Sequence, residues 1–535
     1  IHASLQSFSP LSHSTVILHC GFDLGNTLPL ILRYLHQAPQ KAILFIEPEF
    51  SWFALTLAAH AMESLLQSNR CFFAVGNDWF SQVHSLFLEN SFFVIDRPDL
   101  FLSGTARLAQ RQEVFLPLKT KIIEWIHQGR RQYEREIEKT IEFYAQKPFI
   151  PIRRILALYL QERDGKAIPS IQQRFLSECQ RWGIEISYHR PGFGSDVGFL
   201  QRIARQKPDL IFLINKSPGE YTDRKILDRI RIPRMIWCLD DPHCFVRETF
   251  GQHDFVFTWD PAYQNCLRSM NATSVDHFPY VADMDEIEPH VQERFRSPVS
   301  FVGQVKLYNP DEWGHDSKTS TFIQAMGQCK AQEPHLDYSQ LILEKQQRYG
   351  LQILHNINDP IPASIRYGIY MVANALRRIT LLEKAMPFGL KIYGNDDWSV
   401  FLENHPLRDC FAGSADPQKE VPNIFVSTTI NLNIHSLHAL SSLNQRDFNC
   451  PWVGGFLLTD WVEEADTYFT PNEEMAFYHS PNDLQDKIEY YLHHEEERQA
   501  IVQRGRMRVK KEHTYTTRVP RILEILQTRI RERYE

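Results

Sequence analysis

Several features that mark particular protein classes are missing from this sequence of 535 residues. Its nine cysteines are spread thinly, their number is odd and no CxxC pair occurs, which argues against a disulfide framework and a structural zinc site. No apolar run reaches the ~18–20 residues that span a bilayer, and no secretory signal is visible. These absences predict a cytoplasmic protein without a transmembrane segment.

A basic charge excess is also missing. Lys and Arg number 58, Asp and Glu number 65, and the net charge is −7. This balance argues against a dedicated nucleic-acid binder, which needs a basic face, but leaves room for a local basic pocket. Hydrophobic residues make up 43% and charged residues 23%, as in globular proteins. At ~100–200 residues per domain, the length predicts about three domains.

The start of the chain is typical of a βαβ unit. A β-branched apolar run at 15–20 is followed by a glycine turn at 21–26, a helical pattern at 28–36 and a second apolar run at 41–46. A short strand, a helix and another strand in this order predict a parallel sheet. Further strands are expected at 71–75 and 91–95, each an apolar run of five residues.

The alternation of strands and helices then begins again at two later points in the chain. A charged helix expected at 119–147 ends at prolines, which indicates a domain boundary. We therefore predict an α/β protein with three units, 1–150, 151–296 and 297–535. Strands that alternate with helices predict doubly wound, Rossmann-like sheets.

Strands of the third unit are expected at 299–302, 390–393, 430–434, 455–459 and 468–470, with a long helical region over about 310–385 between the first two.

The stretch from Leu432 to Asp460 is the strongest local motif. A strand leads through a loop to the sequence NQRDF, which opens a helix, and the pair Gly454-Gly455 precedes the next strand. Free N–H groups at a helix start favour anionic oxygens, Arg446 adds a bidentate donor, and glycines allow close approach of a ligand. The stretch predicts a nucleoside-diphosphate site; the alternative is a capped surface helix with a solvated arginine.

This motif and the residues after it resemble the CgeB-like glycosyltransferases, a bacterial branch of the group 1 glycosyltransferases. The trailing matches are Tyr490–Leu492, Glu495–Arg498, Arg504–Arg506 and His513–Tyr515, and the upstream matches are Ser300–Gly303, Ile392–Gly394, Ile236–Pro242 and Phe257–Pro261. The resemblance covers roughly residues 151–520.

The resemblance implies a GT-B fold, in which two Rossmann-like domains face each other across a cleft, here preceded by an extra N-terminal Rossmann-like domain. It implies transfer of a sugar from a nucleotide-sugar donor, UDP- or GDP-type, to an acceptor such as flagellin or a surface glycoconjugate. No cofactor is expected, because helix N-termini and basic side chains stabilise the leaving diphosphate. Asp240-Asp241 and Asp396-Asp397 are adjacent pairs rather than a DxD motif. A homo-oligomer is also compatible with the sequence.

Carried over by position, the resemblance places nine residues beside the donor: Gly303, Gln304, Gly394, His435, Asn444, Gln445, Arg446, Gly454 and Gly455. Arg446 is expected to contact the diphosphate. Asn444 stands where many relatives carry an acidic residue, so it is limited to hydrogen bonding. His435 and His438 would bind a metal only if acids converged on a helical loop; donor-loop hydrogen bonding is the other interpretation.

His243 and Asp241 are the candidates for the acceptor base. They follow the strand expected at 235–239, at a carboxyl end that would face the cleft, where either group could take a proton from an acceptor hydroxyl. The alternative is an ordinary capping turn, since Asp before Pro is a common helix start.

The N-terminal unit carries a partial nucleotide motif made of Gly21, Gly25 and Glu47. Rossmann-like sites use glycines after the first strand and an acid after the second. Here the spacing is loose and one glycine is missing, so a degenerate Rossmann scaffold for partner or acceptor binding is the favoured interpretation. The unit also weakly resembles the methyltransferase-like domain of motility accessory factor proteins. One alternative function is therefore an S-adenosylmethionine-dependent methyltransferase, and a third is a non-catalytic assembly protein that keeps the GT-B fold.

Overall fold

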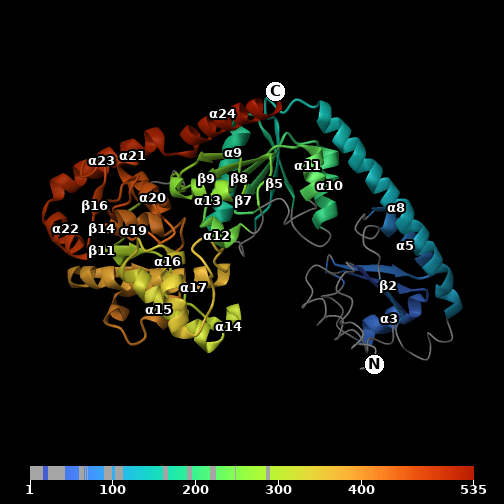
Figure 1. Cartoon of the computed structure of the whole chain (residues 1–535), viewed down its shortest axis with the longest axis horizontal. Coiled ribbons are helices and arrows are strands. Elements are labelled where there is room, and N and C mark those ends of the chain that lie inside the picture. The colour runs from blue at the N-terminus through green and yellow to red at the C-terminus, as the bar shows by residue number, and fades with distance from the viewer. Residues whose placement is uncertain are drawn as a thin grey trace. The chain divides into compact units, whose positions relative to one another are not determined.

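The chain folds around three parallel β-sheets, each with helices between its strands (Figure 1). The computed structural model describes residues 16–21, 42–59, 66, 68, 70–89, 99–102, 112–160, 167–189, 195–216, 224–246, 249–284 and 289–535. All strand pairs given for the first and third sheets are parallel. The predicted α/β class with Rossmann-like sheets is confirmed.

The first sheet has the order β3-β2-β1-β4. Its strands are β1 (Val16–Cys20), β2 (Ala42–Glu47), β3 (Cys71–Val75) and β4 (Asp99–Leu102). The helices described with it are α3 (Phe50–Ala59), α5 (Trp79–Glu89) and α8 (Gln112–Gln146), the last of which is the predicted charged helix. The helix expected at 28–36 and the strand expected at 91–95 lie outside the described residues.

The middle sheet has the order β10-β9-β8-β7-β5-β6. Its strands are β5 (Arg154–Leu158), β6 (Glu185–His189), β7 (Leu210–Ile214), β8 (Arg234–Cys238), β9 (Asp254–Thr258) and β10 (Ser274–His277). The intervening helices include α9 (Ala167–Arg181), α10 (Ser195–Gln206), α11 (Arg224–Ile230), α12 (Pro242–Phe245) and α13 (Gln264–Ser269). All residues of β7, β8 and β9 are buried, which is why these strands are continuous apolar runs rather than alternating ones.

The third sheet has the order β13-β12-β11-β14-β15-β16. Its strands are β11 (Ser297–Val302), β12 (Leu390–Tyr393), β13 (Phe411–Gly413), β14 (Thr428–Asn433), β15 (Leu457–Asp460) and β16 (Ala476–Tyr478). Numbered within the sheet, this is the Rossmann order 3-2-1-4-5-6. The order reverses between β11 and β14, and doubly wound sheets bind ligands at this switch point, beyond the carboxyl ends of the strands.

One predicted strand of this sheet is wrong. Residues 468–470 form no strand: α21 (Ala465–Tyr468) ends there, and the sixth strand is β16. Ala465 and Tyr468 are buried and three residues apart, as on one face of a helix, and the buried Phe469 follows the helix with an extended backbone.

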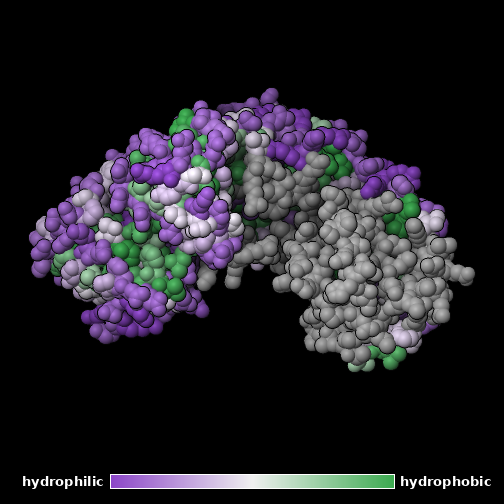
Figure 2. Space-filling model, turned by 60° about the horizontal axis from the view of Figure 1, so that its bottom comes forward, coloured by the Kyte–Doolittle hydropathy of each residue, from purple (hydrophilic) through white to green (hydrophobic). Residues whose placement is uncertain are grey.

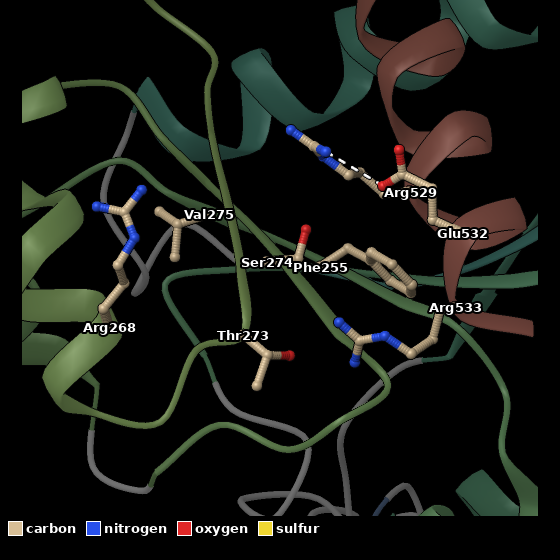
Figure 3. A pocket seen from close by; sticks show the side chains of 8 residues that line it. All are labelled: Phe255, Arg268, Thr273, Ser274, Val275, Arg529, Glu532 and Arg533. Atoms are coloured by element: carbon tan, nitrogen blue, oxygen red, sulfur yellow. Dashed lines mark hydrogen bonds and ion pairs between the residues drawn. The ribbon is translucent and has the colours of Figure 1, made fainter.

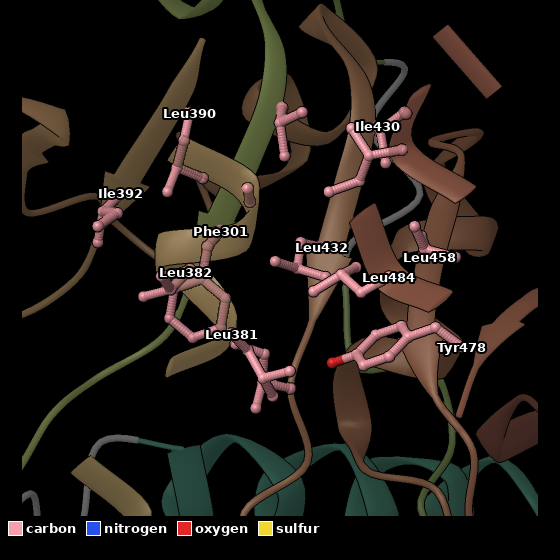
Figure 4. Packing of buried hydrophobic residues seen from close by; sticks show 14 of the residues in the cluster. Phe301, Leu381, Leu382, Leu390, Ile392, Ile430, Leu432, Leu458, Tyr478 and Leu484 are labelled. Atoms are coloured by element: carbon pink, nitrogen blue, oxygen red, sulfur yellow. The ribbon is translucent and has the colours of Figure 1, made fainter. Parts of the chain in front are cut away.

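The core of the third sheet lies between its strands and two helices. Figure 4 shows Phe301, Leu432 and Leu458 on the strands, with Leu382 of α17 (Ala363–Ala385) and Leu484 of α22 (Pro481–His493) beside them. Each of these side chains is at most 2% exposed. Burying side chains of this size contributes ~1.5–3 kcal/mol each, so this cluster fixes α17 against the sheet.

The predicted helical region between β11 and β12 is confirmed. It consists of α14 (Pro310–Trp313), α15 (Ser317–Gln332), α16 (Tyr338–Lys345) and α17. In α15, a Cβ atom on Gly327 would lie 2.4 Å from Val372 Cγ1 of α17, so only glycine allows the two helices to approach this closely. The contact places the long helix α17, which carries functional side chains described below.

The chain divides into two compact units. The first contains Ile1–Tyr159, Ile186–Ile211 and Pro218–Ile232, and the second contains Leu160–Glu185, Phe212–Ser217 and Pro233–Glu535. Strand β5 belongs to the first unit, whereas β8 to β10 and the whole third sheet belong to the second. The boundaries predicted at 150 and 296 stay a prediction.

The chain continues after β16 through α22, α23 (Glu495–Glu512) and α24 (Tyr515–Tyr534), shown in orange to red in Figure 1. Purple, the colour of hydrophilic residues, covers most of the described surface in Figure 2. Among the helices of the described residues, none combines the length and apolar character needed to cross a membrane. All nine cysteines are free thiols.

The Gly327 contact gives a first prediction. Gly327→Ala adds a methyl group where Val372 already lies, and overpacking of this kind costs ~1–3 kcal/mol, although Gly→Ala inside a helix normally gains up to ~1 kcal/mol. Urea denaturation should therefore show a destabilised variant. Val372 Cβ would itself lie 2.5 Å from the added methyl group, so the double variant Gly327→Ala/Val372→Gly, which removes both contacts, should lose less stability than the two single variants lose together. Equal stability of the wild type and Gly327→Ala would contradict this packing.

Candidate functional site

Two arginine side chains meet at the switch point of the third sheet. Arg378 of α17 donates through Nη1 to the carbonyl of Gln304, which follows β11. Arg446, in the first turn of α20 (Gln445–Val453), donates through Nε to Asn433 Oδ1 at 2.7 Å and through Nη2 to the Ile434 carbonyl at 3.4 Å, at the end of β14. The two guanidinium groups therefore occupy the ligand position of a doubly wound sheet.

The Arg378 guanidinium lies in an unfavourable electrostatic environment. Its side chain is buried, and burial together with the charges of Arg446 and Arg377 lowers the pKa of Arg378 to about 10. Among the described residues, its Nε–H has no hydrogen-bond acceptor. A buried cation with an unused donor costs free energy unless an anion joins it. The arrangement is suited to binding a multiply charged anion.

His435 lies between two buried carboxylates beside this pair. Its Nδ1 is 2.6 Å from Asp460 Oδ1, and its Nε2 is 2.7 Å from Asp447 Oδ2. Burial alone would lower the pKa of His435, but the two carboxylates outweigh it and raise the pKa to about 10. The imidazole is therefore a cation at neutral pH. Acids do converge on this histidine, but they occupy both ring nitrogens, so its role here is to bind Asp447 and Asp460.

The two carboxylates in turn position residues of the arginine cluster. Asp460 Oδ2 accepts from Arg377 Nη2 at 2.8 Å, which pairs the Arg377 charge and leaves that of Arg378 unpaired. Asp447 accepts from the backbone N–H of Asn444 at 2.8 Å, and Asn444 accepts from the N–H of Arg446, which completes a capping box at the start of α20. The cap fixes the helix turn that carries Arg446.

The loop at 436–443 is held by a residue of the middle sheet. Asp260, just beyond β9, accepts backbone N–H groups of Leu440, Ser441 and Ser442 at 2.7, 2.9 and 3.3 Å, and the Ser441 hydroxyl at 2.6 Å. The Asp260 carboxylate is fully buried. The loops at the carboxyl ends of the middle and third sheets therefore contact each other directly through Asp260. Asp260 was missed because its Asp-Pro sequence marks only a local cap.

Aromatic and hydroxyl groups surround His438 in this loop. Tyr370 of α17 lies with its hydroxyl 2.5 Å from Ser436 Oγ and 3.0 Å from His438 Nδ1. Tyr263 donates its hydroxyl to the His438 carbonyl at 2.7 Å, and the Trp259 ring packs edge-on against the imidazole at 5.4 Å between centroids. Burial lowers the pKa of His438, so this imidazole is neutral at pH 7.

His243 and Asp241 form a dyad at the carboxyl end of β8. Asp241 Oδ1 accepts the His243 N–H at 3.0 Å and lies 2.9 Å from His243 Nδ1, while Oδ2 accepts from Arg366 Nε at 2.7 Å. Burial raises the pKa of Asp241, but the His243 hydrogen bond and the Arg366 charge lower it to about 2. Asp241 caps α12, so the capping turn is present, and the carboxylate also orients the half-exposed His243.

Gly303 and Gly394 have a packing role at the ends of β11 and β12. A Cβ atom on Gly303 would lie 2.6 Å from the Phe301 ring. One on Gly394 would lie 2.3 Å from the Gly303 carbonyl and 2.6 Å from the Trp398 indole, which donates to that carbonyl at 2.8 Å. Both glycines lie at the carboxyl edge where donor contact is predicted, and neither has room for a side chain, because the Phe301 ring lies beside Gly303, and the Gly303 carbonyl and Trp398 indole lie beside Gly394.

The second glycine pair ends α20. Gly454 adopts a left-handed conformation with φ of 94° and caps the helix, as glycine commonly does. A Cβ atom on Gly455 would lie 2.7 Å from Cys450 Sγ and 2.8 Å from the Phe425 carbonyl. These contacts explain both glycines without a ligand, and their predicted approach to the donor stays a prediction.

The remaining predicted residues have other contacts. Gln445 hydrogen-bonds the buried Asp283. In the first unit, Gly21 has φ of 80° and donates to the Ile46 carbonyl at 2.7 Å, and Glu47 is buried at the end of β2 and accepts the Glu49 N–H at 3.0 Å. Gly25 lies outside the described residues. Within the described residues, no group of three or more His, Cys, Asp or Glu side chains could hold a metal ion.

The His435 network predicts a pH-dependent stability. Its pKa in the folded state is about 10, above the ~6.5 of an unfolded chain. The ion pairs therefore contribute fully below about pH 6.5 and are lost as the pH rises through about 10. His435→Gln should cost ~3–5 kcal/mol at pH 6 and clearly less at pH 10.

Urea denaturation of wild type and variant at both pH values measures this difference, with the exposed His479→Gln as the matched control. An equal loss of stability at pH 6 and pH 10 would show that His435 is not a cation in the folded protein.

Known proteins resemble this chain most clearly in its C-terminal part. Residues 375–524 match a family model described as glycosyl transferase-like. The match begins just before Arg377 and Arg378, includes Arg446 and ends in α24. No curated protein sequence is significantly similar to the chain.

Three solved structures are distantly similar to this chain. TarM from S. aureus has 8% identity and a TM-score of 0.32 over 59% of this chain and 54% of TarM, so the chain spans about half of TarM. A glycosyltransferase from Rickettsia africae has 9% identity and a TM-score of 0.41, covering 71% of this chain and 99% of its own. HepE from Anabaena, solved with UDP and glucose, has 10% identity and a TM-score of 0.40, covering 70% and 100%.

Residues 375–524, which match the glycosyl transferase-like family model, contain Arg378, Arg446 and five of the six strands of the third sheet.

Proposed function

We propose that the protein transfers a sugar from a nucleotide-sugar donor to an acceptor, with the donor diphosphate bound by Arg378 and Arg446. The observation that carries this proposal is the position of the two guanidinium groups. They lie at the switch point of the third sheet, inside the matched glycosyl transferase-like segment, and the buried Nε–H of Arg378 has no acceptor in the part of the chain that the structure describes. The finer resemblance to CgeB-like enzymes agrees with this choice.

The chemistry explains why such a pair is useful. In glycosyl transfer, the bond between the anomeric carbon and the diphosphate oxygen breaks, and negative charge develops on the leaving diphosphate. Guanidinium donors that are already oriented in a region of low dielectric constant stabilise this charge without reorganisation. The N-terminus of α20, which carries Arg446, adds the positive end of a helix dipole. In this proposal the protein's own groups provide the stabilisation, and no metal ion is invoked.

A proton must also leave the acceptor hydroxyl. In our proposal His243 accepts it through Nε2, which lies 3.1 Å from Cys266 Sγ, while Asp241 binds Nδ1 and fixes the orientation of the ring. Asp241 itself is a poor base because its pKa is about 2. The competing group is Asp240, whose pKa is raised by burial and whose carboxylate accepts from Asn215 at 2.6 Å. The acceptor, a protein such as flagellin or a surface glycoconjugate, stays a prediction.

Ligand titration tests the donor site. UDP or GDP should stabilise the protein in thermal unfolding, because ligands that bind the native state raise its stability. Loss of one charge-assisted contact in Arg378→Ala or Arg446→Ala should weaken binding by ~10- to 100-fold. The exposed Arg521→Ala is the matched control.

Stabilisation by S-adenosylmethionine alone would instead support a methyltransferase. Absence of any response to UDP, GDP, CMP and S-adenosylmethionine would favour a non-catalytic protein.

Kinetics with a responsive donor test the base. His243→Gln should lower kcat by ~10²–10⁴-fold and leave the donor Kd unchanged, since His243 does not contact the arginine pair. Asp241→Asn should lower kcat less, because it only orients the imidazole. If Asp240→Asn shows the larger loss and His243→Gln almost none, the base is Asp240 and this assignment is wrong.

A further inference from the structure

A second, separate cavity lies at the opposite edge of the middle sheet. It has a volume of about 330 Å³ and is lined by residues of β9, β10, α13 and α24 (Figure 3). Phe255 and Ser274 lie at the starts of β9 and β10. The proposed donor residues, and Asp260 at the far end of β9, lie beyond the carboxyl ends. The cavity is therefore distinct from the proposed transfer site.

Three arginines line this cavity from two helices. Arg268 comes from α13, and Arg529 and Arg533 come from α24; Figure 3 shows Arg268 on one side and the other two across the cavity. The hydroxyls of Thr273 and Ser274 lie between them. The lining also includes the Glu532 carboxylate, Phe255 and Val275, and five of its eight side chains carry hydrogen-bond donors.

The charges of these arginines are not equally compensated. Arg529 is paired with Asp276 at 3.0 Å and with Glu532 at 3.2 Å. Within the described part of the chain, neither Arg268 nor Arg533 forms an ion pair. Arg268 donates only to the side-chain amide oxygens of residues 264 and 265, both at 3.3 Å, and Arg533 only to a backbone carbonyl. Two cations without a carboxylate partner thus face one small cavity.

We propose that this cavity binds a small molecule that carries a phosphate group, held between Arg268 and Arg533. Guanidinium groups present paired N–H donors whose geometry matches phosphate oxygens, and the hydroxyls of the lining offer additional donors. A volume of about 330 Å³ is at the lower end of the ~300–1,000 Å³ of ligand sites. It exceeds what a phosphate ion fills, so the ligand has an organic part. Arg529 serves a different purpose, since its pair with Asp276 attaches α24 to β10.

Isothermal titration with inorganic phosphate and glucose 6-phosphate at constant ionic strength tests the site, with glucose as the uncharged probe. We expect glucose 6-phosphate to bind, and the double variant Arg268→Gln/Arg533→Gln to bind it at least tenfold more weakly. The variant Arg521→Gln/Arg531→Gln removes two charges from the same helix outside the cavity and should bind normally. The thermal unfolding midpoint confirms that the variants are folded.

The proposed donor site could also bind a phosphate, so Arg446→Ala is measured in parallel. Binding that persists in Arg446→Ala and falls in the double variant supports the cavity site, whether or not the donor site is correct. Binding lost in Arg446→Ala and retained in the double variant overturns it, as does the absence of binding by either phosphate probe. Cavity-dependent binding of heparin alone would identify a polyanion surface and also overturn the proposal.

Discussion

The site depends on one buried ion arrangement, in which the His435 imidazolium lies between Asp447 and Asp460. Without the imidazolium, the carboxylates of Asp447 in the first turn of α20 and Asp460 at the end of β15 would be buried without this cation, and such charges are costly unless paired. With it, Asp447 is free to cap α20 and Asp460 to bind Arg377. Through these two carboxylates, the His435 imidazolium fixes the helix turn that carries Arg446 and also fixes Arg377, the neighbour of Arg378.

As a consequence, the three arginines of the site have different partners. Arg377 is paired with Asp460, Arg446 bonds neutral oxygens, and Arg378 keeps an unused buried donor. A protein that only needed a stable core would gain by replacing such a group. Its presence where Rossmann sheets bind ligands is understandable if an anion completes it. Asp260 extends the arrangement to the middle sheet, because it holds the loop that carries His438.

Local sequence patterns were sufficient for most of the sheets and for one part of the site. Strand β3 and strand β12 match their predicted bounds to the residue, since short apolar runs between turns need no long-range information. Arg446 and Asn444 were found because the capping motif is local. Arg378 was not, since its partner Gln304 is 74 residues away. Asp260 was missed for the same reason, because Ser441 is 181 residues away.

The glycines show where a local sequence pattern is ambiguous. The sequence suggested that Gly394 and Gly455 lie close to a ligand, whereas the structure shows that indole, sulfur and carbonyl atoms already occupy the space beside them. A glycine in a sequence indicates close approach but does not identify what approaches.

A crystal structure of the protein with bound nucleoside diphosphate tests the central claim most directly. The account predicts diphosphate oxygens within hydrogen-bond distance of Arg378 Nε and of the Arg446 guanidinium, with His435 still between its two carboxylates. A diphosphate bound elsewhere, with the Arg378 Nε–H still without an acceptor, would contradict it.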